Sequence, residues 1–247
     1  KKGSNFDLPI AVALPVATGE IEQSRCEGII FIGELGLDGA VRSVRGVLPT
    51  LVSAIKHGID RSIIPAHNLE ESALVTSMQS IGVQNISELI AVLRDGEAPA
   101  KEESESKEFT LDSYLDLSDV VGQKSARYAL EIAAIGGHHI LFIGPPGTGK
   151  TMLAERIPTI MPPLPQEKAL EVSAIHSIAG TLDDRGALSA LPPFVAPHHS
   201  TTSIAMVGGG SHTIKPGACS LAHEGVLFID EAPECSNGVL DSLRQPL

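Results

Sequence analysis

The length, composition and charge of the chain exclude several classes of protein. Its 247 residues are 43% hydrophobic and carry a net charge of −12, no apolar run approaches the roughly 18 residues that span a bilayer, and no N-terminal segment has the pattern of a signal peptide. The three cysteines form no C-x-x-C pair, so neither a disulfide framework nor a zinc site is indicated, and we expect a cytoplasmic protein with no membrane partner.

Residues 1–94 alternate between helix and strand patterns, which predicts an α/β domain. Helices are expected from Asp7, over Val47–His57 with Gly58 closing it, and over Ile86–Arg94, with strands at Gly28–Ile32 and Arg61–Pro65. The chain opens on Lys1-Lys2-Gly3 without an initiator methionine, and its first helix begins almost at once. We therefore expect the N-terminus to be cut.

An acidic segment follows at residues 95–116. Nine acidic residues and two lysines lie between Asp95 and Asp119, and few of the residues around them are apolar. Such a composition buries too little surface to offset its ordering entropy. It predicts a flexible linker. Because so many of the acidic residues lie in this segment, the net charge of the rest of the chain is mild.

The segment from Ile140 to Thr151 has the pattern of a phosphate-binding loop. A turn at Val121–Gln123 and an apolar-faced helix ending near Gly137 lead to a predicted strand at Ile140, which runs into the sequence GPPGTGKT. Glycines let successive backbone N–H groups point at phosphates, the lysine supplies a positive charge, and the final threonine hydroxyl is suited to Mg²⁺. The pattern predicts ATP binding through Gly144, Pro145, Pro146, Gly147, Thr148, Gly149, Lys150 and Thr151. In this layout the loop Val120–Gln123 would lie beside the adenine.

A second segment, Gly225–Glu231, has the pattern of a Walker B strand, which fits with the phosphate-binding loop. Four apolar residues end in Asp230 and Glu231, as expected of a buried parallel strand with acids at its C-terminal end. Thr151 is the expected Mg²⁺ ligand and Asp230 is predicted to hold the ion through water. Glu231 is predicted to polarise the water that attacks the γ-phosphate, with Lys150 as the other catalytic residue.

Other residues between the two motifs are less specific. Proline has a fixed φ and no N–H, so Pro158, Pro162 and Pro163 are expected to end the helix that follows the phosphate loop. His198 and His199 could suggest a metal site, but adjacent residues point in different directions and no third ligand is evident nearby in the sequence. Gly208–Gly210 is predicted to permit a tight or mobile turn, and His138 and His139 are expected to be structural.

The order of these motifs resembles the magnesium-chelatase-like AAA+ ATPases of the ComM/YifB type. The resemblance rests on Gly122-Gln123, the phosphate loop, IHSIAG (Ile175–Gly180), APHHST (Ala196–Thr201), MVGGG (Met206–Gly210) and SLAHEGVLFIDEAPE (Ser220–Glu234). Residues 1–94 resemble the N-terminal domain of the same family, which is related in fold to the Lon protease domain. The resemblance implies an α/β chain with a partial Lon-like domain (1–94), an acidic flexible linker (95–116) and the N-terminal part of a P-loop AAA+ domain with a parallel sheet (117–247).

The resemblance leaves two functions open. One is a ring of subunits, a hexamer, that hydrolyses ATP to move branched or single-stranded DNA in recombination and natural transformation, with Lys215 as a candidate DNA contact and His198-His199 in an inter-subunit or pore-facing insert. The alternative is a chelatase-type ATPase that remodels a metal-insertion partner. The Lon-like domain favours the first, whereas the acidic charge and scarce aromatic residues weakly disfavour nucleic acid.

The sequence argues against a third activity, Lon-type proteolysis through a Ser-Lys dyad. Asn5 stands at the position of the serine and Leu48 at that of the lysine, and a leucine cannot deprotonate a hydroxyl. The chain ends at Leu247, before the sensor strand, arginine finger and helical lid of an AAA+ domain. We therefore expect it to bind nucleotide weakly and hydrolyse it poorly.

Overall fold

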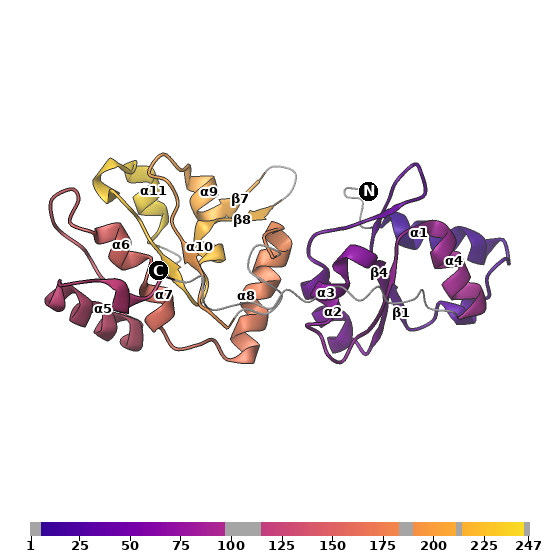
Figure 1. Ribbon diagram of the computed structural model, residues 1–247. Coiled ribbons are helices and arrows are strands. Elements are labelled where there is room, and N and C mark those ends of the chain that lie inside the picture. The colour runs from indigo at the N-terminus through magenta and orange to yellow at the C-terminus, as the bar shows by residue number, and fades with distance from the viewer. Residues whose placement is uncertain (1–5, 97–114, 183–189, 211–213, 245–247) are drawn as a thin grey trace. The chain divides into compact units, whose positions relative to one another are not determined.

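The computed structural model describes residues 6–96, 115–182, 190–210 and 214–244 (Figure 1). The chain divides into two compact units, residues 1–106 with 177–187 and residues 107–176 with 188–247. This division places 177–187 in the first unit, whereas the sequence-based boundaries placed them in the second. Most of the predicted linker, and the Asn5 of the protease argument, lie outside the described residues.

The first unit is built on a parallel three-stranded sheet in the order β1-β4-β5. Its elements are α1 (Asp7–Ala17), β1 (Ile29–Phe31), β2 (Glu34–Leu35), β3 (Val41–Arg42), α2 (Val47–Lys56), β4 (Arg61–Pro65), α3 (Leu69–Ser72), β5 (Gln79–Val83) and α4 (Ile86–Asp95). The predicted helices and strands of this region are therefore confirmed, within about one residue at each end.

Helices cover both faces of this sheet, so its central strand is buried on two sides, whereas the outer strands β1 and β5 are mostly half-buried. Ile63 of β4 packs with side chains of α1 and α4, while α2 and α3 lie on the opposite face (Figure 1). After Arg61, every residue of the central strand β4 is buried. The apolar residues Ile63, Ile64 and Pro65 are adjacent rather than alternating, which is the sequence pattern of a strand covered on both faces.

The second unit holds the two predicted nucleotide motifs. Its elements are α5 (Lys124–Gly136), α6 (Lys150–Ala154), α7 (Ile157–Ile160), α8 (Gln166–Ala179, of which the last three residues belong to the first unit), β6 (Phe194–Val195), α9 (Ser203–Val207), β7 (Gly208–Gly209), β8 (Lys215–Pro216), α10 (Ala218–Leu221), β9 (Val226–Leu227) and α11 (Asn237–Ser242).

The parallel strands β6 and β9 form the centre of this unit, and their side chains alternate between two cores. Phe194, Val226 and Phe228 pack with α5, α6 and α7, and the Phe194 and Phe228 rings stack with centroids 5.9 Å apart. Val195, Leu227 and Ile229 face the opposite way, toward α9, α10 and α11. The unit is thus an α/β layered structure, as its sequence predicts. Its parallel pair is half-buried rather than fully buried as the sequence suggested.

The strand predicted at Ile140 is not formed. The backbone of Ile140–Ile143 has no ladder to another strand within the described part of the chain. Its side chains nevertheless alternate, because Ile140 and Phe142 pack against the core while Leu141 and Ile143 are 77% and 90% exposed. A strand needs hydrogen-bonded neighbours as well as an alternating pattern, and the pattern alone was insufficient here.

The helix after the phosphate loop is shorter than predicted. It ends at Ala154, and Pro158 lies in the first turn of the next helix, α7, rather than at the end of one. Pro158 has no N–H to donate to the carbonyl of Ala154, so α6 cannot continue through it, while its fixed φ suits a first turn. Helix α7 then ends at Ile160, two residues before Pro162, as expected.

Candidate functional site

The phosphate loop forms a tight turn that leads directly into α6. Gly147 and Gly149 have φ angles of +78° and +82°, which is the left-handed region that favours glycine. The Thr148 hydroxyl donates to the carbonyl of Pro145 at 2.9 Å, and the Leu153 N–H donates to the carbonyl of Gly149 at 3.0 Å. The sequence folds locally into this turn because glycine occupies both left-handed positions.

The Lys150 side chain folds back over the loop. Its Nζ donates to the carbonyls of Gly144 and Pro145, each at 3.1 Å. These are ordinary hydrogen bonds on an exposed side chain, so exchange of the carbonyls for phosphate oxygens leaves the ammonium with charge-assisted partners. The lysine is therefore already directed at the loop on which a phosphate would lie.

The structure brings the two predicted Mg²⁺ ligands together across 79 residues of sequence. The Thr151 Oγ1 donates to Asp230 Oδ2 at 2.9 Å, and Asp230 Oδ1 accepts the N–H of Glu231 at 3.0 Å. Neighbouring oxygens around an octahedral Mg²⁺ with bonds of about 2.0–2.1 Å lie about 2.9 Å apart. The hydroxyl and carboxylate therefore fit the donor set and spacing of a Mg²⁺ site.

Gln123 contacts the phosphate loop, although the sequence predicted only that its loop lies near the nucleotide base. Its φ of +45° turns the chain just before α5, and its Nε2 donates to the carbonyl of Thr148 at 3.1 Å. A Cβ added at Gly149 would lie 3.2 Å from the same nitrogen. The side chain of Gln123 thus supports the turn of the loop rather than standing apart from it.

The two adjacent histidines after β6 lie against each other and have different partners. Their ring centroids are 4.0 Å apart, although adjacent residues were expected to point in different directions. His198 Nδ1 lies 2.8 Å from the Ser200 hydroxyl. His199 lies between two carboxylates, with Nδ1 3.7 Å from Glu231 Oε2 and Nε2 3.9 Å from Glu234 Oε2. Further ligand-type groups therefore do lie near His199, supplied by the neighbouring strand segment.

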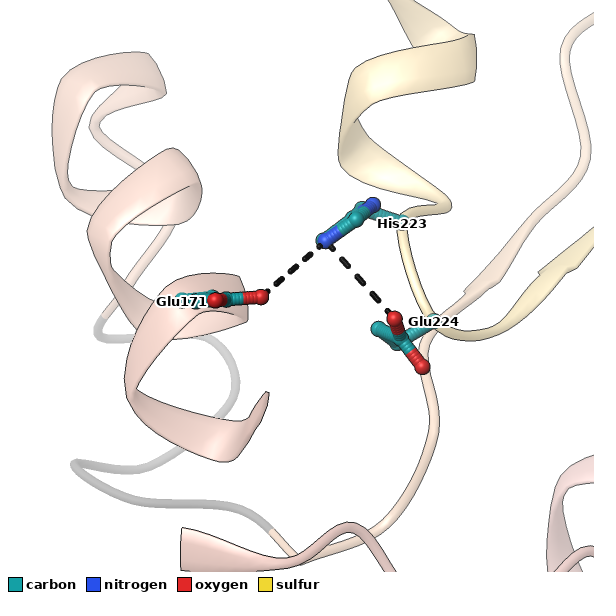
Figure 2. Close-up of side chains that lie close together, drawn as sticks. All are labelled: Glu171, His223 and Glu224. Atoms are coloured by element: carbon teal, nitrogen blue, oxygen red, sulfur yellow. Dashed lines mark ion pairs between the residues drawn. The ribbon is translucent and has the colours of Figure 1, made fainter. Parts of the chain in front are cut away.

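A second cluster of acids and histidine lies away from the phosphate loop. Figure 2 shows His223 pointing between Glu171 of α8 and Glu224, with His223 Nε2 3.5 Å from Glu171 Oε2 and 4.0 Å from Glu224 Oε1. The ammonium of Lys168 lies 2.9 Å from Glu224 Oε1 and 3.5 Å from Glu171 Oε2. The hydrogen bond to Glu224 and the charge of Glu171 raise the pKa of Lys168. Because the Lys168 ammonium already pairs with both carboxylates, we interpret this cluster as a surface ion-pair network.

The glycine-rich turn is a short antiparallel hairpin in which β7 pairs with β8. Gly208, at φ +96°, approaches its partner strand so closely that an added Cβ would lie 2.9 Å from the carbonyl of Lys215. Gly208 and Gly209 are therefore strand residues rather than the turn that the sequence predicted there, and Lys215 is exposed. Residues 211–213 at the tip lie outside the described residues.

Comparison with known proteins gives consistent matches over the whole chain. The family described as "Magnesium chelatase, subunit ChlI" matches residues 116–247, and the family "Subunit ChlI of Mg-chelatase" matches residues 1–68. The chain is 47% identical over 247 residues to the uncharacterized protein Rv2897c of Mycobacterium tuberculosis. It is 43% identical over 253 residues to the uncharacterized protein YifB of Salmonella typhimurium and 40% identical over 252 residues to the competence protein ComM of Haemophilus influenzae.

These matches include all of this chain but only part of each relative. They cover 100% of this chain and 49%, 48% and 49% of Rv2897c, YifB and ComM, respectively. The chain therefore spans about half the length of the curated relatives that it matches. Among the described residues, no helix combines the length and apolar character needed to cross a bilayer.

Proposed function

The chain belongs to the magnesium-chelatase-like family that includes ComM and YifB, and we propose that it binds ATP with Mg²⁺ as part of an AAA+ ATPase. The observation that carries the proposal is the meeting of Thr151 and Asp230 at 2.9 Å beside a glycine turn with two left-handed residues. A structural turn alone would not require a carboxylate from a distant strand at the start of its helix.

Each residue of the site has a distinct proposed role. The backbone N–H groups of the loop and the Lys150 ammonium bind the phosphates, and Thr151 and Asp230 hold the metal ion. Bound Mg²⁺ neutralises the charge that develops on the transferred phosphoryl group. Glu231, which follows Asp230 in the turn after β9, orients and polarises the attacking water. The side chain of Glu231 is 60% exposed, so solvent water reaches it.

We propose further that the intact protein assembles as a ring, a hexamer by family resemblance, that couples ATP hydrolysis to movement on branched or single-stranded DNA. The support is the similarity to a protein named for competence, which spans both units of this chain. Under this proposal residues 1–94 form a non-proteolytic Lon-like domain, residues 95–116 a flexible linker, and residues 117–247 the first part of the AAA+ domain.

A second candidate is a chelatase-type ATPase that remodels a metal-insertion partner. Both families that match the chain are described as a subunit of magnesium chelatase. The net charge of −12 also opposes binding to polyanions on average. Exposed Lys215 beside the glycine hairpin offers a local positive charge to DNA. The two candidates therefore differ in whether DNA changes the rate of ATP hydrolysis.

The test is the steady-state ATPase rate of the full-length protein with and without four-way-junction DNA. Lys150→Ala serves as the blank, and Lys56→Ala, at the end of α2 in the first unit, is the matched control for removal of a lysine. DNA stimulation that Lys150→Ala abolishes and Lys56→Ala preserves supports the DNA motor. A rate that depends on Lys150 but not on DNA supports the chelatase-type remodeller, and hydrolysis unaffected by Lys150→Ala contradicts both.

A further inference from the structure

His199 reaches Glu231 because two parallel strands end side by side. Val195 of β6 is in register with Leu227 of β9, and the Phe228 N–H donates to the carbonyl of Val195 at 2.9 Å. His199 is the fourth residue after Val195, and Glu231 is the fourth residue after Leu227. Carboxyl ends of parallel strands lie at the same edge of a sheet, and here they bring an imidazole and the Walker B glutamate together.

The backbone of Glu231 is held in an unusual conformation at this edge. Its φ of +49° lies in the left-handed region, which is uncommon for residues other than glycine. Its N–H donates to Asp230 Oδ1, and the short 3₁₀ turn Ala232–Glu234 begins directly after it. The backbone is thus fixed by its neighbours, whereas the carboxylate lies on a flexible side chain that is 60% exposed.

His199 is an imidazole neighbour that can restrict the orientation of the Glu231 carboxylate. Its Nδ1 faces Glu231 at 3.7 Å and its Nε2 faces Glu234 at 3.9 Å, and the ring is 33% exposed. Both distances exceed a direct hydrogen bond of about 2.7–3.2 Å, and hydrogen bonds of catalytic groups often tighten only when the reactants bind. A neutral imidazole carries one N–H, so Glu231 and Glu234 compete for it.

We infer that His199 is a positioning residue for Glu231, holding its carboxylate in the orientation from which it polarises water. The inference rests on the proposed ATPase function and adds a residue that the Walker motifs do not contain. His199 would not contact nucleotide or Mg²⁺, because its charged neighbours are Glu231 and Glu234 rather than Lys150, Thr151 or Asp230. Its loss should therefore lower the rate of hydrolysis without weakening nucleotide binding.

The chain offers a matched control in the adjacent residue. His198 has the same side chain and its ring lies tilted against that of His199, but its Nδ1 pairs with the Ser200 hydroxyl at 2.8 Å. His198→Ala removes the contact between the rings and leaves the His199–Glu231 contact in place. Its kcat should stay within about two-fold of the unmodified protein, since neutral contacts at exposed sites contribute little.

The experiment measures kcat and the ATP dissociation constant of the full-length protein and its His199→Ala, His199→Gln and His198→Ala variants. For His199→Ala we expect kcat to fall about ten-fold, roughly 1.4 kcal/mol, with ATP affinity unchanged. The glutamine amide can still donate to Glu231, so His199→Gln should recover most of the lost rate.

Three outcomes would overturn the inference. In the first, His199→Ala hydrolyses ATP as fast as the unmodified protein. In the second, both His199 variants lose ATP affinity as well as rate, which indicates a structural role. In the third, His198→Ala is as slow as His199→Ala. Failure of the proposed function itself looks different, because the unmodified protein would then show no hydrolysis that depends on Lys150.

Discussion

Replacing Gly147 with alanine should weaken ATP binding through the backbone alone. Gly147 has a φ of +78°, and a Cβ added there meets no atom within 4 Å. A left-handed conformation costs an L-residue about 1–2 kcal/mol. If that cost depopulates the binding-competent turn, the apparent dissociation constant for ATP rises by about 5- to 30-fold. Gly149→Ala should weaken binding at least as much, since its Cβ would also lie 3.0 Å from the Met152 Cε.

Titration with a fluorescent ATP analogue, together with urea unfolding, measures both effects. Gly58→Ala is the matched control, because Gly58 has a φ of +80° and likewise nothing within 4 Å of an added Cβ, but lies after α2 in the first unit. It should lose stability without losing ATP affinity. Asparagine tolerates the left-handed region better than alanine, so Gly147→Asn should bind more tightly than Gly147→Ala. If Gly147→Ala binds ATP as well as the unmodified chain, the left-handed turn is not what binds phosphate.

Three further predictions concern stability, each followed by urea unfolding. Leu130 is fully buried in the core of the second unit, so Leu130→Ala should destabilise it by about 2–5 kcal/mol, whereas a loss below about 1 kcal/mol would contradict that packing. The Asn85 side chain accepts the Glu88 N–H at 3.0 Å as the cap of α4, so Asn85→Ala should cost about 1 kcal/mol, and a neutral effect would show that the cap is not needed. A hydrogen bond from the Ser118 N–H lowers the pKa of Asp116 from its usual value of 3.8. The charged carboxylate therefore stabilises the fold at pH values above 3.8, and this stabilisation disappears as the pH falls through the lowered pKa. The stability difference between the unmodified chain and Asp116→Asn should therefore shrink in acid, and a difference that stays constant with pH would contradict the assignment.

The sequence predicted the longer helices and two of the three sheet strands of the first unit because these elements are specified locally, but it did not predict β5. The strand at Arg61–Pro65 ends in three adjacent apolar residues and lies between a left-handed glycine at position 58 and a 3₁₀ turn at Ala66–Asn68. Its predicted bounds match those of β4. The helix at Ile86 begins after an asparagine cap and ends at Gly96 in the left-handed conformation. Such signals depend on residues next to one another in the chain, and a single sequence displays them directly.

The features that the sequence missed depend on contacts between distant segments. Ile140–Ile143 has the alternation of a strand but lacks a ladder within the described part of the chain, and no residue of the segment itself indicates whether a partner strand is present. The approach of His199 to Glu231 required the parallel register of β6 with β9. One signal was present, since APHH and Asp-Glu each follow a short apolar run, and parallel strands place such ends together.

The central claim, that this chain binds Mg²⁺–ATP through the phosphate loop and Asp230, is tested most directly by calorimetric titration of ATP into the chain. The titration is run with Mg²⁺ and again with EDTA, on the unmodified chain and on Lys150→Ala. The account predicts saturable binding of one ATP per chain that is tighter with Mg²⁺ and lost in Lys150→Ala. Binding that is equally tight in EDTA and in Lys150→Ala, or no binding at millimolar ATP, would contradict it.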